Sequence, residues 1–313
     1  MGATTAIENQ VVIGVSSCLC GEAVRYDGGH KRDRFVADVL PRLFRVRALC
    51  PEAGAGLGVP RPPVHLEQRE DGVHAVGVER PELDVTAALQ RYADDVVPEL
   101  AELYGYVFKS RSPSCGLKGV PLRQGGRWTR SGRGLFAAAL SDARPLLPAV
   151  EEGEVQDAAG HRLFVERVEG YRRWRSRGPM DLRRFHRREQ LTLLAHGARR
   201  ARALGRWLEG GEGVEPAEYG RRFMAALAYP LTRRREQRAM GRALRRLAPQ
   251  LDDAQRQQAE AAVAAFAAGE QGWLAPILLL QSLARQVSDP WLMEQSYLNP
   301  SPAACTLARD GGR

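Results

Sequence analysis

The sequence lacks any run of about 18 apolar residues and contains only five cysteines among its 313 residues. Without such a run, no membrane-spanning helix is expected. The opening segment, MGATTAIENQ, has no basic stretch followed by an apolar one, so we expect a cytoplasmic protein without a secretory signal. Five cysteines are too few for a disulfide scaffold in a chain of this length, and metal binding or catalysis is the more usual role.

Two common cofactor fingerprints are also missing. Neither the glycine-rich GxGxxG pattern nor the phosphate-binding GxxxxGKS/T pattern occurs, so the sequence predicts no nucleotide cofactor site. The closely spaced CxxC pairs that are typical of structural zinc are absent as well, since Cys18 and Cys20 are separated by one residue.

Acidic residues are the minority among the charged ones, with 37 Asp and Glu against 46 Lys and Arg, and the formal net charge is +9. Most of the excess lies after residue 150, where the basic residues are Arg. An Arg-rich second half fits a polyanionic partner such as RNA. The alternative is a set of ordinary solvated helix faces in a composition that favours Arg over Lys, and composition alone leaves both possibilities open.

Strand-like apolar runs at 11–17, 44–49 and 105–110 alternate with helical patterns in the first half. This alternation predicts an α/β domain with a parallel sheet and helices on its faces. Residues 64–79 alternate in polarity on either side of Asp71 and Gly72, which predicts a hairpin. Two further helical patterns, at 136–147 and 163–174, extend the expected domain over residues 1–177.

Strand signals disappear after residue 178. Helical spacing over 185–208 and around 216–228, 233–248, 252–268 and 273–287 predicts an all-α domain over residues 178–313. Arginine is dense at 172–206 and again at 221–246. Because Arg binds phosphate in a bidentate manner and stacks on bases, these helices favour an RNA-binding surface. The alternative is an Arg-rich face that makes internal ion pairs.

Three cysteines follow the three predicted strands: Cys18 in VVIGVSSC, Cys50 in FRVRALCPE and Cys115 in GYVFKSRSPSCG. The carboxyl ends of parallel strands form the edge of a sheet where ligands bind. Thiolates are soft ligands that favour zinc or an iron–sulfur cluster, and three of them would leave one iron of a cluster without a protein ligand. The alternative is three buried, inert cysteines.

The motifs around these cysteines resemble the thiouracil desulfurase family. They are Ser17-Cys18-Leu19 followed by Gly21, then VRYDGGHKRD (24–33), CPE with GLGVPRPP (50–63), and KSRSPSCG (109–116). The resemblance covers about residues 10–175. It implies a Rossmann-like domain, a 4Fe-4S cluster held by Cys18, Cys50 and Cys115, and a non-redox reaction in which the open iron takes the sulfur of a thiocarbonyl and water replaces it. Cys20 stands where the family usually has Leu, so neither it nor Cys305 is expected to be a ligand.

Glu52 lies two residues from a cluster ligand, and we expect it to do acid–base work on the attacking water. The alternative is a carboxylate that stabilises the N-terminus of a helix beginning at Pro51. Ser112 and Ser114 flank Pro113 beside Cys115. We expect them to hydrogen-bond the substrate or the cluster, and the alternative is capping of the following turn.

The loop RYDGGHKR is cationic and interrupted by glycines. We expect it to bind a phosphate through Arg25, Lys31 and Arg32 together with loop amides, and the alternative is a simple turn.

In the second half, FH…LTLLAH, DPWLMEQ and YLNP resemble a helical domain of unknown function that is fused behind desulfurase-like domains. Such fusions are associated with removing sulfur from 4-thiouridine in tRNA. We therefore expect a tRNA 4-thiouridine desulfidase whose helical domain binds tRNA through Arg187, Arg188, Arg199 and Arg200. The alternatives are an enzyme acting on free thiouracil or thio-nucleotides, and a non-enzymatic iron–sulfur sensor that binds nucleic acid.

Overall fold

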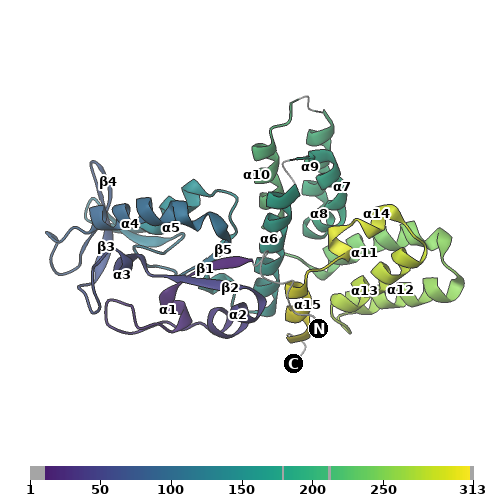
Figure 1. The fold of residues 1–313 in the computed structure, drawn as a ribbon, viewed down its shortest axis with the longest axis horizontal. Helices are drawn as coiled ribbons and strands as arrows, with labels where there is room; N and C mark the ends of the chain where they lie inside the picture. Colours follow the sequence, from purple (N-terminus) through teal and green to yellow (C-terminus); the bar gives the residue numbers. More distant parts are fainter. Residues whose placement is uncertain (1–10, 178–179, 211–212, 311–313) are drawn as a thin grey trace, which may run out of the picture. The chain divides into compact units, whose positions relative to one another are not determined.

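The computed structural model describes residues 11–177, 180–210 and 213–310. They form two compact units, which divide between Gly160 and His161 (Figure 1). The first unit contains all the strands of the described residues, and the second is helical, as predicted. No helix in the described part of the chain has the length and apolar content needed to cross a membrane.

The first unit is built on a four-stranded parallel sheet. Its strands, in the order β2-β1-β5-β8, are β2 (Arg45–Leu49), β1 (Val12–Ser16), β5 (Leu103–Phe108) and β8 (Ala149–Glu151). Every residue of β1 is buried, as expected for a central strand covered on both faces. A methyl group at Gly14 would overlap the Tyr106 ring, so this glycine lets the ring pack directly against the strand. The predicted parallel sheet is confirmed.

Helices and short helical turns connect these strands. They are α1 (Ser17–Cys20), a π-helical turn (Phe35–Val39), α2 (Leu40–Leu43), α3 (Pro51–Gly54), α4 (Thr86–Glu99), α5 (Leu135–Ala143) and 3-10 turns at Leu100–Glu102 and Glu152–Glu154. The helix predicted over 136–147 is α5, and it ends earlier than expected. Pro145 explains the early end, because a residue that precedes proline is disfavoured in helical conformation.

A second, smaller sheet has the strand order β4-β3-β6-β7. The predicted hairpin over 64–79 is confirmed as β3 (Val64–Arg69) and β4 (Gly72–Gly77), which pair antiparallel. The other hairpin, β6 (Val120–Gln124) and β7 (Arg127–Gly132), was not predicted. Its two turn residues, Gly125 and Gly126, both have positive φ, at 56° and 78°, which is the backbone of a tight two-residue hairpin turn.

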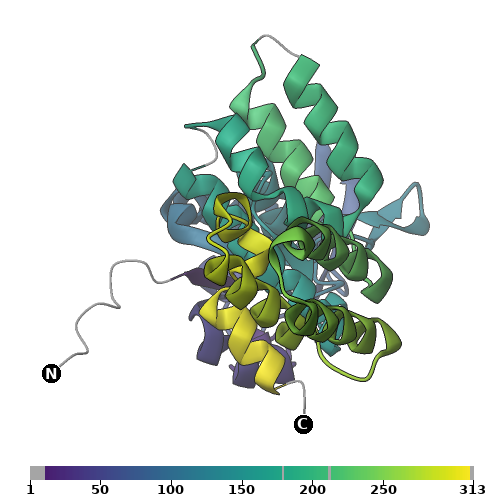
Figure 2. The same cartoon turned by 90° about the vertical axis from the view of Figure 1, so that its right-hand side faces the viewer.

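The second unit is all-helical over its described residues. Its helices are α6 (Ala158–Arg177), α7 (Leu182–Arg188), α8 (Gln190–His196), α9 (Ala198–Gly210), α10 (Pro216–Leu227), α11 (Arg233–Leu247), α12 (Asp253–Ala268), α13 (Leu274–Gln286), α14 (Pro290–Met293) and α15 (Pro302–Asp310), with 3-10 turns at Ala248–Gln250 and Ser296–Leu298. Helices α11, α12 and α13 contact one another, and Met240, Phe266 and Leu280 lie in their shared core (Figures 1 and 2). The four helices predicted between residues 216 and 287 are confirmed.

Helix α6 explains why the compact units divide before the boundary that we expected after residue 177. Its side chains pack on helices of the second unit. Trp174 stacks on Tyr219 with ring centroids 5.5 Å apart, and Arg173 donates to Glu189 at 2.7 Å. The sequence pattern predicted this helix correctly but assigned it to the first domain.

Candidate functional site

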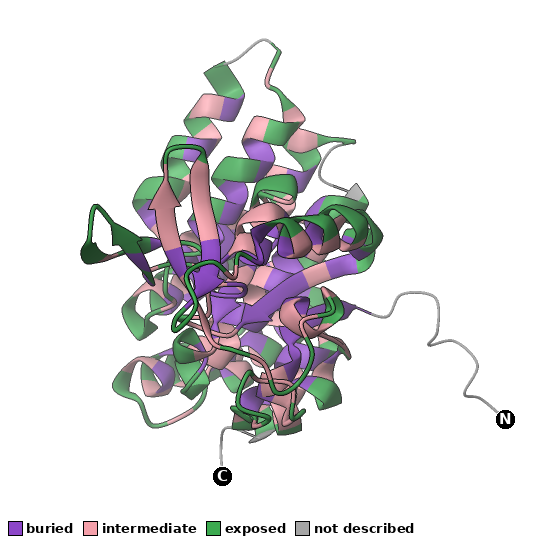
Figure 3. Ribbon diagram, turned by 90° about the vertical axis from the view of Figure 1, so that its left-hand side faces the viewer, coloured by how far each residue is buried: buried purple, intermediate pink, exposed green. Residues whose placement is uncertain are grey.

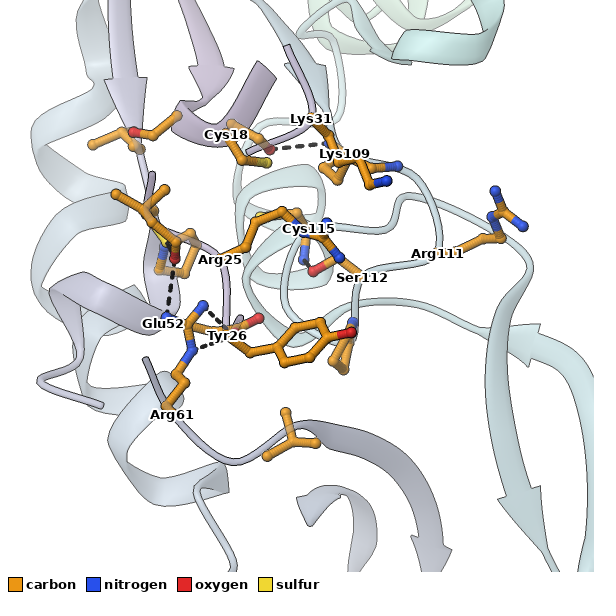
Figure 4. Close-up of a pocket in the computed structure, with 18 of the residues that line it drawn as sticks. Cys18, Arg25, Tyr26, Lys31, Glu52, Arg61, Lys109, Arg111, Ser112 and Cys115 are labelled. Carbon is orange, nitrogen blue, oxygen red and sulfur yellow. Dashed lines mark hydrogen bonds and ion pairs between the residues drawn. The ribbon is translucent and has the colours of Figure 1, made fainter. Parts of the chain in front are cut away.

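A cavity of about 490 Å³ lies at the carboxyl ends of β1, β2 and β5 (Figure 4). Cys18 enters it from α1 directly after β1, Cys50 follows β2, and Cys115 lies in the loop after β5. The three cysteines that the sequence singled out therefore line one cavity, although they come from three distant segments. Cys20, in α1, and Cys305, in α15, are not among the lining residues.

Backbone contacts fix the segment that carries each thiol. Helix α1 ends at Gly21, whose φ of 100° is left-handed, and the Cys18 carbonyl accepts from the Lys31 amide at 2.9 Å. Cys50 is the residue before α3, which begins with Pro51. The hydroxyl oxygen of Ser112 accepts from the Cys115 amide at 3.1 Å, and so holds the turn that presents the third thiol.

Cys115 is buried and Cys18 and Cys50 are half-buried, which favours the neutral form of all three thiols. Burial raises the pKa of Cys18 from 9.0 to about 11, and the neighbouring Cys50 acts in the same direction, while Lys109 and Arg25 oppose the shift. Burial also raises the pKa of Cys50, and that of Cys115 far above its ordinary range. Three neutral thiols facing one cavity become thiolates when a cation binds between them, because metal ligation displaces the protons.

The donor set fits a multi-atom cluster better than one ion. Among the residues that the structure describes, no three His, Cys, Asp or Glu side chains lie close enough to hold a single metal ion. Structural zinc requires four close ligands, whereas an iron–sulfur cluster bridges thiolates that are farther apart. Three soft donors around a space of this size therefore suit an iron–sulfur cluster.

The Glu52 carboxylate faces the same cavity and is held on both oxygens. Its Oε2 accepts from Nε of Arg61 at 2.7 Å, and its Oε1 accepts from the hydroxyl of the fully buried Ser114 at 2.8 Å. The side chains of Glu52 and Arg61 are only 13% and 5% exposed. Glu52 also lies in the first turn of α3, so the helix-terminal position considered as an alternative is present too.

Ser112 and Ser114 have different surroundings. Ser112 lines the cavity, and its oxygen accepts from the amides of Ser114 and Cys115. Ser114 is absent from the lining and reaches the site through Glu52. The capping alternative therefore applies to the oxygen of Ser112, whereas Ser114 orients the carboxylate.

Four further cationic side chains line the cavity: Arg25, Lys31, Lys109 and Arg111. Lys109 forms an ion pair with Glu152, and the Glu152 carboxylate also accepts from the Ser110 amide at 2.7 Å. This surplus of positive charge favours thiolates, a leaving sulfide or a phosphate in the cavity.

Of the three basic residues predicted to bind phosphate, Arg25 and Lys31 line the cavity and Arg32 does not. Arg32 forms an ion pair with Asp38, and its aliphatic stem packs beside Gly21. Because Arg32 lies outside the cavity lining, its position does not support the predicted role as a phosphate ligand there.

Among the lining residues that were not singled out from the sequence are Tyr26, Arg61 and Lys109. All three lie inside the short motifs around the cysteines, so the motifs themselves were the available signal. Tyr26 is 40% exposed, and the Arg25 guanidinium lies 5.3 Å from the centre of its ring. Figure 4 shows the Tyr26 ring lying between the labelled Arg61 and Ser112.

The four arginines predicted to bind tRNA lie on helices α7 and α9. Arg187 and Arg188 contact Glu294 at 3.4 and 3.3 Å, and Arg184 contacts the same carboxylate at 3.6 Å, so three cations share one anion. Arg199 is exposed, and the Arg200 guanidinium lies over the Tyr229 ring at 3.1 Å. The face combines ion pairing with a surplus of positive charge.

Comparison with known proteins matches the two compact units to two different families. Residues 13–152 match the model of the 2-thiouracil desulfurase family, and residues 190–302 match that of a family of unknown function, DUF1722. A solved structure of the 4Fe-4S-dependent thiouracil desulfidase TudS is 31% identical to this chain, with a TM-score of 0.38. The aligned region covers 47% of this chain and 93% of the TudS chain. The uncharacterized protein YbgA of Escherichia coli strain K12 is 26% identical over 132 residues, which are 41% of this chain and 78% of YbgA.

The first unit is an α/β domain with a cysteine-lined cavity at the carboxyl ends of its parallel strands. It belongs to the 2-thiouracil desulfurase family, which is a family of enzymes.

Proposed function

We propose that this protein is a desulfidase that removes sulfur from thiolated uracil, with 4-thiouridine in tRNA as the substrate and uridine and sulfide as the products. One observation carries the proposal: thiols from three separate strand ends line a single cavity together with a fixed carboxylate and several cations. The family match of residues 13–152 supports the same reaction.

Cys18, Cys50 and Cys115 are the residues that would hold a 4Fe-4S cluster. When bound, such a cluster supplies an iron without a protein ligand, which is a Lewis acid for a soft thiocarbonyl sulfur. The overall change is a hydrolysis, in which C=S and water give C=O and hydrogen sulfide, so no external oxidant or reductant is required.

Glu52 accepts a proton from the water that attacks the thiocarbonyl carbon, and it returns the proton to the departing sulfur. Arg61 and Ser114 hold its two oxygens, so the carboxylate keeps one orientation through the reaction. Lys109, Arg25 and Lys31 surround the cavity with positive charge, which stabilises a leaving sulfide and attracts an anionic substrate.

The arginines of the second unit support tRNA as the substrate. Arg187, Arg188, Arg199 and Arg200 lie on α7 and α9, where the positive charge exceeds that of the nearby acidic groups. A thiolated base within an RNA must leave its stack before it can enter a cavity of this kind. Binding of the surrounding RNA by the helical unit offsets the free energy of that unstacking.

A second candidate substrate is free thiouracil. The match to the 2-thiouracil desulfurase family spans residues 13–152, which lie within the first unit alone. If the cavity accepts a base without the rest of an RNA, the helical unit has a role other than substrate delivery.

Anaerobic cluster reconstitution followed by mass spectrometry of nucleosides from treated tRNA tests the proposal. The expected result is loss of 4-thiouridine, an equal gain of uridine and release of sulfide, with Cys50→Ala as the inactive control. Conversion of free thiouracil with untouched tRNA would favour the second candidate. Inactivity of the reconstituted protein on both substrates would contradict the desulfidase assignment.

A further inference from the structure

The outer face of the second sheet carries an exposed aromatic side chain. Trp128, on β7, is 59% exposed (the hairpins of this sheet are seen in Figure 3). It lies opposite Arg123 in the strand register, and Arg123 lies opposite Glu67 of β3, so these three side chains share one face. The opposite face, with Leu66 and Leu122, packs into the core of the unit.

Positive charge surrounds this tryptophan. Arg127 precedes Trp128 beside the hairpin turn, and Arg130 lies two residues after it on β7. Both arginines are exposed, and no ion pair between described residues involves either of them. Arg123 lies 3.8 Å from Glu67, which also pairs with Arg69 at 3.3 Å. The hairpin therefore presents an exposed aromatic ring with arginines nearby in the chain, and Arg127 and Arg130 have no acidic partner in the described structure.

Protection of the sheet edge accounts for the arginines but not for the tryptophan. Strand β7 is the last strand of its sheet, and charged side chains on such a strand prevent pairing with other chains. A large exposed aromatic ring at the same position has the opposite effect, because it favours association. The combination of an aromatic ring with flanking arginines is typical of surfaces on which a base stacks while cations contact the phosphates.

Strand β3 connects the hairpin to the cavity wall. The tight turn at Gly125 and Gly126 fixes the register of β6 and β7. Val64, the first residue of β3, lines the cavity, and the ring of the next residue, His65, meets the Trp128 ring edge-on at 5.2 Å. The cavity wall and the contact that supports the tryptophan are thus made by consecutive residues of β3.

We propose that Trp128, with Arg127 and Arg130, forms a platform for an unpaired nucleotide of the RNA that flanks the one whose thiolated base enters the cavity. The inference rests on the proposed function in one respect, namely that the substrate base is part of an RNA. The platform belongs to the desulfurase domain itself and is distinct from the arginines of the helical unit.

The test compares Trp128→Ala, Trp128→Phe and the double variant Arg127→Ala/Arg130→Ala in the full-length, reconstituted protein. The probes are an unmodified single-stranded oligoribonucleotide for Kd, and 4-thiouridine tRNA and free thiouracil for kcat/KM. Trp128→Ala is expected to weaken oligonucleotide binding about 5- to 100-fold, the range for loss of one stacked base, and to lower the ratio of tRNA to free-base turnover. Trp128→Phe is expected to keep most of the affinity.

The double arginine variant is expected to reduce the slope of log Kd against log salt by about one for each phosphate contact that is lost. Arg91→Ala, which removes an exposed arginine from α4, is the matched control and is expected to change neither probe. Iron content and cluster absorbance of every variant are measured alongside.

The outcomes separate this inference from the proposed function. Wild-type Kd and wild-type tRNA turnover in Trp128→Ala would overturn the platform. If the wild-type protein leaves tRNA untouched, the proposed substrate is wrong, and the platform is then judged by the oligonucleotide Kd alone. If Trp128→Ala leaves RNA binding unchanged but abolishes self-association in sedimentation, the face binds protein and the inference is overturned.

Discussion

The Arg61 guanidinium places two nitrogens, Nη2 at 2.6 Å and Nε at 2.7 Å, on a single oxygen of the Glu52 carboxylate. Its third nitrogen, Nη1, donates to the carbonyls of Val24 and Gly58 at 3.0 and 2.9 Å. One buried side chain therefore joins the proposed base to two loops of the cavity wall. Arg61 acts on the reaction through Glu52, which makes it a positioning residue.

Arg61→Ala leaves the mostly buried Glu52 carboxylate without its cation, so we expect a loss of about 3 kcal/mol in the free energy of unfolding. We also expect kcat to fall more than KM changes, because the orientation of the base is disturbed. Arg61→Lys restores the charge but not the two-nitrogen contact, and should recover stability better than kcat. Urea unfolding and steady-state kinetics measure the two effects, and equal recovery of both would argue against a positioning role.

The second prediction concerns the cluster ligands. Cys18→Ala, Cys50→Ala and Cys115→Ala should each lose iron and the visible absorbance of the reconstituted cluster. Cys20→Ala and Cys305→Ala serve as controls and should keep both, because neither side chain lines the cavity. Full cluster retention in any of the first three variants would refute that ligand assignment.

Glu52→Gln keeps the size of the side chain and its contact with Ser114 but removes the proton acceptor. Turnover should fall at least about 100-fold, the scale of general acid–base catalysis, while cluster absorbance stays unchanged. Turnover is measured on free thiouracil as well as on tRNA, so that an effect on RNA binding is not mistaken for one on chemistry. Near-normal turnover would leave only the helix-terminal role for Glu52.

A pH effect is expected in the helical unit. Burial lowers the pKa of His196 from 6.5 to about 4, although its hydrogen bond to the Tyr229 carbonyl opposes the shift. The pKa of His196 is lower in the folded state than in the unfolded state, so protonation favours the unfolded state. The free energy of unfolding should therefore fall as the pH drops from about 6.5 towards 4, by about 3 kcal/mol in total. Urea unfolding between pH 7 and pH 4 should show a steeper loss for the wild type than for His196→Gln. Parallel curves would exclude His196 as the cause.

The fifth prediction tests the basic face of the helical unit. Arg187→Glu and Arg199→Glu, alone and together, should weaken tRNA binding and flatten its salt dependence, because fewer counterions are released on binding. Cluster content should not change. Arg188 is less suitable for reversal because it is half-buried, whereas Arg187 and Arg199 are exposed. Unchanged binding in the double variant would remove this face from the proposed RNA surface.

The sequence was sufficient to predict the parallel sheet and the meeting of three cysteines, because both follow from apolar runs that end in Cys-bearing turns. It was not sufficient for Arg61, whose contact with Glu52 depends on where the loop between β3 and α3 folds back. The β6–β7 hairpin was missed because β7 has no aliphatic residue and β6 has only Val120 and Leu122, so neither strand gives a clear apolar alternation. Its only clear local signal is the pair Gly125–Gly126.

The boundary of the second unit could not be predicted from the sequence either. The helical pattern over 163–174 is plain in the sequence, but periodicity identifies an apolar face without identifying its partner. Trp174 finds that partner in Tyr219. Such pairings are set by tertiary packing, which local propensity does not encode.

The spacing of the three thiols along the chain has a consequence for how the protein matures. Cys18, Cys50 and Cys115 line one cavity only after β1, β2 and β5 have paired, so an emerging chain on the ribosome does not offer the complete set of thiols until β5 is in place. In a zinc finger the metal drives folding. Here we expect the reverse order, in which the domain folds first and the proposed cluster enters the finished cavity afterwards. Iron starvation should therefore leave a folded, inactive pool that can be rescued without new protein synthesis.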